Sequence, residues 1–542
     1  MAERRNLWQW HLVSLALYAL ESWWFLDHGA SLTGHVLGSG SDPSLIMWFL
    51  AWWPWAVAHH AVALHTHLLW QPAGLNLAWT TCVPLLALLG LPATLLSGPI
   101  LSFNLLTLAA PALAAYGAFL LCLELFATPV AAIIGGWLFG FSPYESAQSF
   151  DHLNLDFTLL IPLMLLVVVR RLRGKSSRTH TALWLAVLLA GEFYISDEIL
   201  ATLVTFSALA LILGFALLPG WRARLRRLAV DLSLSAPLAL LLISPLLIPM
   251  LTGRFDVAHP ARWPFIFSTD LLNFILPTPA TSFFGADRHF TGGFDEQTGY
   301  LGLPAIVILL LAAYEFRRNP PYRLAFILLG LVLLASLGPV LHIGGHVTNI
   351  VLPWALLLHL PLLGNALPAR CMLYAALLAA ILVAGWVSAA PTRLRVLAAL
   401  LACASLLPAP HPVATSPASP FFAPGRLEAT LGAHPRLLIL PFGINGPSSY
   451  WQAENHFGFT QVGGYLGFPP VEMQKYPAVP QMFFTKFTSH FPADLAKFAH
   501  ATGTQYVIAG PGTPPGEWAA LRTLDWVPKK IDDITMFTVP SA

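Results

Sequence analysis

Long apolar runs recur along the chain and limit it to one broad class of fold. A helix needs about 20 mostly apolar residues to cross a bilayer, so these runs predict a bundle of membrane-spanning helices. With the shorter runs included, about eleven candidate spans can be drawn at this length: 7–26, 98–123, 129–142, 157–170, 179–196, 199–219, 228–250, 301–316, 323–341, 371–389 and 394–408.

The composition agrees with a membrane protein. Hydrophobic residues make up 56% of the 542 residues and charged residues only 10%, whereas soluble domains carry roughly a quarter charged residues. A net charge of +2 excludes a typical nucleic-acid-binding protein. The four cysteines show neither a CxxC pair nor a zinc spacing, so they are predicted to be small buried side chains: Cys82, Cys122, Cys371 and Cys403.

Basic residues predict the orientation of the spans. Most Lys and Arg residues before residue 409 fall in five short segments, which the positive-inside rule assigns to the cytoplasm: 4–5, 170–178, 222–227, 317–323 and 393–395. The N-terminus is then cytoplasmic and the C-terminal segment extracytoplasmic, in a multi-pass protein of a cell membrane. Most acidic residues fall on the outer side. Either the longer outer loops hold more polar residues of every kind, or an outward-facing site uses carboxylates.

The first outer loop, residues 27–97, combines one acidic residue with many tryptophans. Because Trp favours the membrane–water interface, residues 44–66 are predicted to form a helix along the outer face. Asp42 would lie just before that helix, as a helix cap, as a catalytic group or as both. Histidines at 59, 60, 65 and 67 could bind a metal, but no ligand set is complete, so they are interpreted as polar-face residues.

Three further outer loops carry candidate site residues, at about 143–156, 251–300 and 342–370. Asp151 and His152 are grouped with Asp197 and Glu198, because ionisable groups at membrane depth usually face a wet cavity; Asp197 and Glu198 could instead only cap a helix. Outer-face arginines are candidate clamps for a phosphate, or else simply solvated or paired with nearby acids: Arg254, Arg262, Arg288 and Arg370. The apolar stretch at about 350–363 is too short to span and is predicted to be re-entrant or interfacial.

The C-terminal part has the composition of a soluble domain. A linker rich in Pro, Ala and Ser at 409–425 separates the transmembrane domain, 1–408, from an extracytoplasmic α/β domain, 426–542. Strands are predicted at 436–443, 504–510 and 533–540, with helices at 494–503 and 516–524. The polar stretch 450–470 is either a binding loop or a long connection.

Several stretches together resemble the type-C (GT-C) membrane glycosyltransferases and the related YfhO-like bacterial membrane proteins. They are GSGSD (38–42) before the Trp-rich helix, LLWQPAGLNL (68–77), GPILSFNLLTLAAPALAAYGAFLL (98–121), AAIIGGWLFGFSPYESAQ (131–148), NALPARCMLYAALLAA (365–380), and LPFG and YWQAENH in the C-terminal part. The resemblance implies that the first-loop carboxylate, Asp42, is the general base. Many GT-C families have two acids there, so a partner would come from elsewhere, such as Asp151 or Asp197.

The implied function is the transfer of a sugar from a polyprenyl-phosphate donor to an envelope glycan, lipid or protein, with inversion at the anomeric carbon. A carboxylate in a partly dry site would accept the proton of the acceptor hydroxyl, and an arginine would stabilise the leaving phosphate. No cofactor is required by the sequence, and a divalent metal is left open. The alternatives are a transporter or flippase of lipid-linked glycans and a non-catalytic membrane scaffold; only the enzyme requires Asp42.

Overall fold

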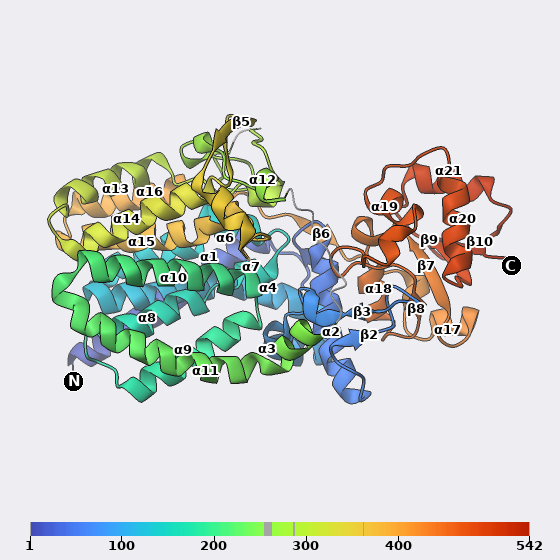
Figure 1. Cartoon of the computed structure of the whole chain (residues 1–542), viewed down its shortest axis with the longest axis horizontal. Helices are drawn as coiled ribbons and strands as arrows, with labels where there is room; N and C mark the ends of the chain where they lie inside the picture. The colour runs from blue at the N-terminus through green and yellow to red at the C-terminus, as the bar shows by residue number, and fades with distance from the viewer. Residues whose placement is uncertain (1, 254–262, 286–287, 361–362, 541–542) are drawn as a thin grey trace. The chain divides into compact units, whose positions relative to one another are not determined.

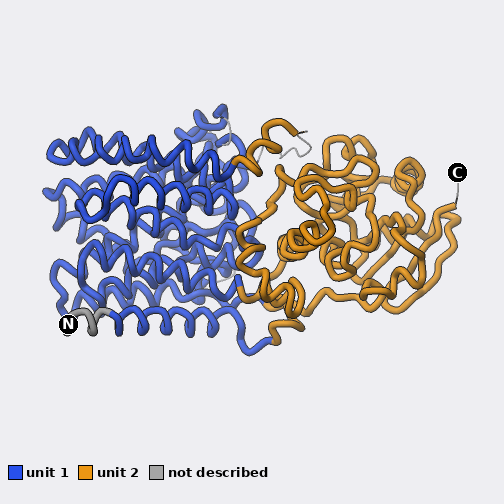
Figure 2. Tube along the Cα trace, turned by 90° about the horizontal axis from the view of Figure 1, so that it is seen from below, with its two compact units in different colours: residues 1–30, 106–243, 260–412 blue, residues 31–105, 244–259, 413–542 orange. Residues whose placement is uncertain are grey.

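Two compact units make up the part of the chain that is described in the computed structural model, residues 2–253, 263–285, 288–360 and 363–540 (Figures 1 and 2). Unit 1 contains residues 1–30, 106–243 and 260–412. Unit 2 contains residues 31–105, 244–259 and 413–542. The first outer loop therefore clusters with the C-terminal part of the chain. Arg254 and Arg262 lie outside the described residues.

Unit 1 is built from helices, as predicted, with a short hairpin of β4 and β5. Its α-helices include α1 (Ala2–Leu26), α5 (Pro129–Gly140), α6 (Pro143–Gln148), α7 (Leu153–Asp156), α8 (Leu160–Leu172), α9 (Arg178–Phe193), α10 (Asp197–Leu217), α12 (Trp263–Ile266), α13 (Leu303–Glu315), α14 (Pro320–Ser336), α15 (Met372–Ala389) and α16 (Arg393–Ser405). Two long helices, α4 (Pro99–Phe126) and α11 (Arg222–Thr252), have residues in both units. The strands are β4 (Val340–Ile343) and β5 (His346–Val351).

Five helical segments in the described chain are long and apolar enough to cross a membrane: 99–126, 153–172, 197–217, 219–252 and 368–389. The described chain also has three shorter apolar helices, α3 (Pro84–Ser97), α13 and α14. The membrane-helix class is thus supported, while the number of about eleven spans stays a prediction from length.

Helix α15 lies in the core of unit 1, where it packs on α5, α13 and α14. Small residues allow close helix packing, as is common in membrane bundles. A Cβ atom at Gly140 in α5 would lie 2.4 Å from the carbonyl oxygen of Pro111 in α4.

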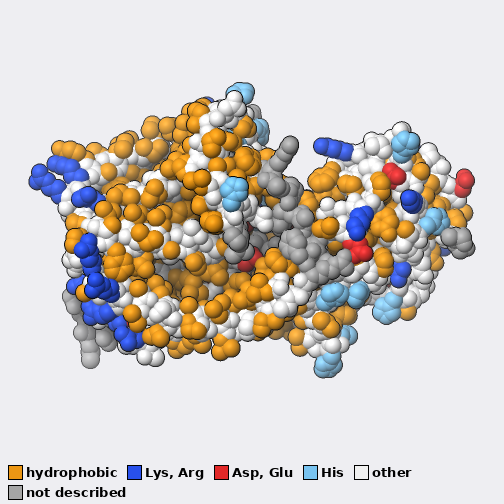
Figure 3. Space-filling view, viewed as in Figure 1, with side chains coloured by type: hydrophobic (Ala, Val, Ile, Leu, Met, Phe, Trp, Pro, Cys, Tyr) orange, Lys and Arg blue, Asp and Glu red, His pale blue; other side chains and the backbone are white. Residues whose placement is uncertain are grey.

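Lys and Arg side chains gather at the end of unit 1 where the N-terminus lies (Figures 1 and 3). Several are paired there: Lys175 contacts Glu124 at 2.6 Å, and Arg395 contacts Glu315 at 2.8 Å. This gathering agrees with the placement of the basic loops on one side of a membrane, which was predicted from the sequence.

Unit 2 contains a five-stranded mixed sheet with strand order β10-β11-β9-β7-β8. Strand β7 (Arg436–Leu440) pairs in parallel with β8 (Thr460–Gln461) and β9 (Tyr506–Ala509), and β11 (Ile534–Thr538) runs antiparallel to β9 and to β10 (Val527–Ile531). Helices α20 (Phe491–Ala501) and α21 (Pro515–Thr523) alternate with the strands. The predicted α/β segments at 436–443, 494–503, 504–510, 516–524 and 533–540 are confirmed within a few residues.

Segments far apart in the sequence meet in unit 2. Strand β1 (His35–Leu37) pairs antiparallel with β6 (Val413–Thr415), and α2 (Asp42–Ala58) packs on α18 (Ser448–Glu454). The predicted helix at 44–66 corresponds to α2, which ends eight residues earlier, at Ala58. Trp48 and Trp52 are 0% and 2% exposed and pack inside unit 2. The position of this helix along the outer face of a membrane stays a prediction.

A buried carboxyl in unit 2 gives a pH prediction. Glu517 in α21 is 0% exposed, and burial raises its pKa to about 8 from an ordinary value of 4.5. Its favourable contribution to the free energy of unfolding is complete below pH 4.5 and is lost as the pH rises through 8, because the buried group must then ionise. We expect Glu517→Gln to unfold at a higher temperature than the wild type at pH 9 and at the same temperature at pH 4.

The measurement is thermal unfolding followed at several pH values. Asp525→Asn, a change at an exposed residue of the same unit, is the matched control and should leave the pH dependence as in the wild type. Parallel curves for Glu517→Gln and the wild type across this range would contradict the assignment.

Candidate functional site

Asp42 begins α2 and belongs to unit 2. The residue that caps the helix is Ser41, and Asp42 occupies the first turn, where a negative charge interacts favourably with the helix dipole. Its side chain is half-buried. The Tyr465 hydroxyl donates a hydrogen bond to Asp42 Oδ1 at 2.7 Å. The predicted general base is thus held by a residue from the C-terminal part of the chain.

Tyr465 is itself held from two sides. The Ser449 hydroxyl donates to the Tyr465 carbonyl oxygen at 2.8 Å and accepts from its backbone N–H at 3.0 Å. The Tyr465 ring lies beside Phe483 of α19 (Ala478–Phe483), with the ring centroids 6.4 Å apart. The tyrosine is only 9% exposed, so its hydroxyl has little freedom to turn away from Asp42.

Two glycines allow the chain to reach this position. Gly464 has a φ of +113°, in the region that favours glycine. A Cβ atom there would lie 2.2 Å from Leu69, and a Cβ atom at Gly463 would lie 2.5 Å from the ring of Phe442. The sequence Gly463-Gly464-Tyr465 therefore combines a close approach of the backbone with a hydroxyl donor.

The polar stretch 450–470, whose role the sequence left open, is folded against α2. The Trp48 indole N–H donates to Gln452 Oε1 at 2.9 Å, and Gln452 Nε2 donates to the carbonyl oxygens of Leu68 and Phe459 at 2.9 and 3.0 Å. The Phe457 ring lies against three tryptophans of α2 at centroid distances of 4.9 to 5.5 Å: Trp48, Trp52 and Trp55. This stretch fixes α2, and with it Asp42.

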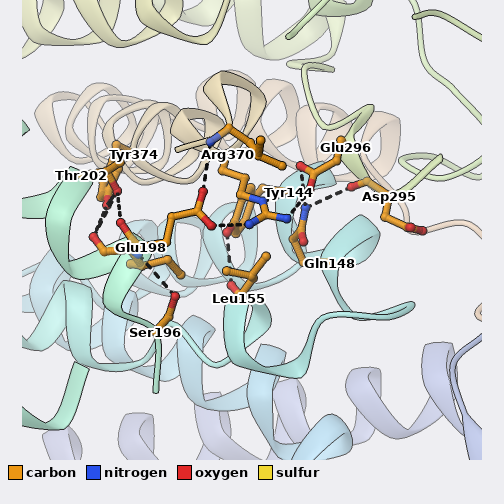
Figure 4. A network of polar contacts seen from close by, with 12 residues as sticks. Tyr144, Gln148, Leu155, Ser196, Glu198, Thr202, Asp295, Glu296, Arg370 and Tyr374 are labelled. Atoms are coloured by element: carbon orange, nitrogen blue, oxygen red, sulfur yellow. Dashed lines mark hydrogen bonds and ion pairs between the residues drawn. The ribbon is translucent and has the colours of Figure 1, made fainter. Parts of the chain in front are cut away.

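A second polar network lies in unit 1 around Arg370 (Figure 4). Its guanidinium pairs with Glu198 of α10, and its Nε and Nη2 donate to Glu296 Oε1 at 2.8 and 2.6 Å. Glu198 also accepts the backbone N–H of Leu367 at 3.1 Å. Gln148 Nε2 of α6 donates to the Asp295 carbonyl oxygen at 3.0 Å and reaches Glu296 Oε2 at 3.5 Å.

The network changes the interpretation of Arg370. Two carboxylates already neutralise its charge, so in this structure it joins α10 to the segment that carries Glu296 rather than presenting a free cation to a phosphate. Glu198 and Arg370 were both predicted to be site residues, and the structure brings these two together. Gln148 and Glu296 were not predicted as their partners.

Buried carboxyls lie close to this network in the sequence. Glu145 of α6 is 1% exposed and accepts the Thr158 hydroxyl at 2.5 Å. Burial raises its pKa well above the usual range, and the neighbouring carboxyl of Asp156 raises it further. Glu145 lines a small recess with His411, whose pKa is lowered by burial to about 4. The recess favours the uncharged forms of both groups.

The remaining predicted residues have varied surroundings. Asp151 and His152 are half-buried between α6 and α7, and each has further contacts. Asp197 is exposed in the first turn of α10, whose capping residue is Ser196, and Arg288 is exposed in a loop. Asp42 belongs to unit 2 and Asp151 and Asp197 to unit 1, so a shared site stays a prediction. Within the described ranges, no group of three His, Cys, Asp or Glu residues could hold a metal ion.

The fold is similar to the folds of several solved glycosyltransferase structures. The cryo-EM structure of the arabinofuranosyltransferase AftD from Mycobacteria matches with a TM-score of 0.61 at 15% identity, over 98% of this chain and 40% of that chain. The apo oligosaccharyltransferase from Archaeoglobus fulgidus matches with a TM-score of 0.54 at 15% identity, over 94% of this chain and 71% of that chain. This chain thus spans about two-fifths of AftD.

ArnT from Cupriavidus metallidurans, bound to undecaprenyl phosphate, matches with a TM-score of 0.50 at 11% identity, over 98% of both chains. At such identities the likeness shows the fold alone. The chain belongs to the family described as a domain of unknown function (DUF6311), which matches residues 14–407. No curated protein matches the sequence.

Proposed function

We propose that this protein is a membrane glycosyltransferase that moves a sugar from a polyprenyl-phosphate donor to an envelope acceptor on the outer face of the inner membrane. The observation that carries the proposal is a half-buried carboxylate, Asp42, held by a tyrosine hydroxyl at the start of α2, in a chain with a GT-C fold. Catalysis lies in the site rather than in the fold, so this carboxylate is the part to test.

In the proposed reaction, Asp42 accepts the proton of the acceptor hydroxyl as the acceptor oxygen attacks the anomeric carbon. The bond between that carbon and the donor's phosphate oxygen breaks, and the polyprenyl phosphate leaves with the electron pair. One displacement of this kind inverts the anomeric centre. A base of this type contributes about 10²- to 10⁴-fold to the rate.

The donor class is supported by two of the structural neighbours. An AglB structure from Archaeoglobus fulgidus contains a dolichol-phosphate and an inhibitory peptide, and the ArnT structure contains undecaprenyl phosphate. We propose the same donor class here and an acceptor that is an envelope glycan, lipid or protein. Exposed Arg288 is the candidate contact for the phosphate, together with Arg254 and Arg262, while His152, Asp151 and Asp197 are candidates for binding or assisting the reaction.

The proposed orientation follows from charge. The end of unit 1 where Lys and Arg side chains gather is assigned to the cytoplasm, which also places the N-terminus inside (Figure 3). The C-terminal α/β segments then lie outside the cell membrane.

The test uses the full-length protein in lipid nanodiscs with radiolabelled undecaprenyl-phosphoryl pentoses and hexoses. We expect one donor to lose its sugar to water slowly and to an added envelope extract faster, with release of undecaprenyl phosphate. Donors that all remain intact would contradict the proposal. Movement of intact donor across a vesicle membrane without cleavage would instead favour a flippase.

A further inference from the structure

The geometry points to Tyr465 as a positioning residue for the proposed base, so that the C-terminal part of the chain completes the catalytic site. This inference deepens the proposed function and rests on it. Tyr465 does not touch the reacting atoms. It acts through Asp42, whose Oδ1 accepts a hydrogen bond from the tyrosine hydroxyl at 2.7 Å.

Three sets of contacts hold the segments that carry Tyr465 and Asp42 in place. Ser449 fixes the Tyr465 backbone through both its N–H and its carbonyl oxygen. The Gln452 side chain ties the same segment to Trp48 of α2, six residues after Asp42. Phe457 fills the face formed by the tryptophans of α2. The donor, Tyr465, and the acceptor, Asp42, are therefore both held in place within unit 2.

The hydrogen bond has one consequence for a base. It fixes the rotation of the carboxyl group, and general-base catalysis depends on such orientation. Removing the hydroxyl should therefore lower the rate of the chemical step and leave the binding of the donor unchanged.

The first experiment measures the kinetics of Tyr465→Phe. We expect the turnover rate to fall about tenfold and the donor KM to stay within about twofold, because the hydroxyl orients the base and does not bind the donor. Tyr506→Phe, which removes a hydroxyl from β9 of the same unit, should match the wild type. A Tyr465→Phe protein with the turnover rate of the wild type would overturn the inference.

A second variant set separates this inference from the proposed function. If Tyr465 acts only through Asp42, adding Tyr465→Phe to Asp42→Asn should cause no further loss of activity. A full additional tenfold loss would mean that the tyrosine acts elsewhere, and would overturn its role while leaving Asp42 as the base. An active Asp42→Asn protein would instead overturn Asp42 as the base of the proposed reaction.

A cycle of unfolding midpoints does not need activity at all. Asp42→Ala removes the acceptor, Tyr465→Phe removes the donor, and the double variant removes both. Their effects on the denaturation midpoint should be less than additive, because either change alone breaks the same hydrogen bond. Strictly additive effects would overturn the contact itself, whichever substrate the protein uses.

Discussion

Asp42→Asn should reduce the rate of sugar transfer by about 10²- to 10⁴-fold. The amide has nearly the shape of the carboxylate, and its oxygen can still accept the Tyr465 hydroxyl, so α2 should keep its place. The amide cannot accept a proton at neutral pH, however, and the attacking hydroxyl then has no base. The measurement is sugar release from the radiolabelled donor by the protein in nanodiscs.

The control for this variant is Asp525→Asn, which changes an exposed carboxylate of unit 2 in the same way. Both variants should elute as the wild type does in size-exclusion chromatography and unfold at the same temperature. An Asp42→Asn protein that transfers sugar at the rate of the control would exclude Asp42 as the base.

The largest effect on stability is expected from Arg370→Met. Methionine fills a similar volume but leaves Glu198 and Glu296 without their shared cation; these side chains are 24% and 5% exposed. Breaking a buried ion pair by removing one partner costs about 3–5 kcal/mol, because the remaining charge stays buried. We expect the variant to unfold at a much lower temperature in detergent and to be recovered in a smaller amount in the membrane fraction.

Two comparisons make this result specific. Adding Glu198→Gln and Glu296→Gln to Arg370→Met removes the unpaired charges and should restore much of the lost stability. Arg426→Met breaks an exposed pair with Asp532 and should change the unfolding temperature little, since surface pairs contribute little. Wild-type stability of Arg370→Met would mean that the network of Figure 4 is not a structural support.

Local sequence predicted the elements well and their partners poorly. The apolar runs and the alternating segments of the C-terminal part carry their own periodicity, so helices such as α10 and strands such as β7 and β9 could be placed. Asp42 stood out because it precedes a Trp-rich helix. Its partner Tyr465 is 423 residues away, and nothing in the surrounding sequence of either residue indicates the other.

The partners of Arg370 could not be predicted from the local sequence either. A lone arginine in an outer loop suggests a phosphate contact, but Arg370 pairs with two carboxylates that lie 74 and 172 residues away in the sequence. The tryptophans of α2 were expected at the membrane interface because that is the usual preference of the residue type. Their packing against Phe457, which lies far along the chain, could not be predicted from the local sequence.

The pairing of β1 with β6, and of α2 with α18, sets an order of events during biosynthesis. The segment that begins at His35 emerges early, yet its strand partner at Val413 and its helix partner at Ser448 are made only after all the intervening helices. The early segment therefore cannot complete its packing until residues 413–454 have been synthesised. Maturation of unit 2 thus depends on segments that are made late, and a chain that stops before them lacks the strand and helix against which its first loop folds.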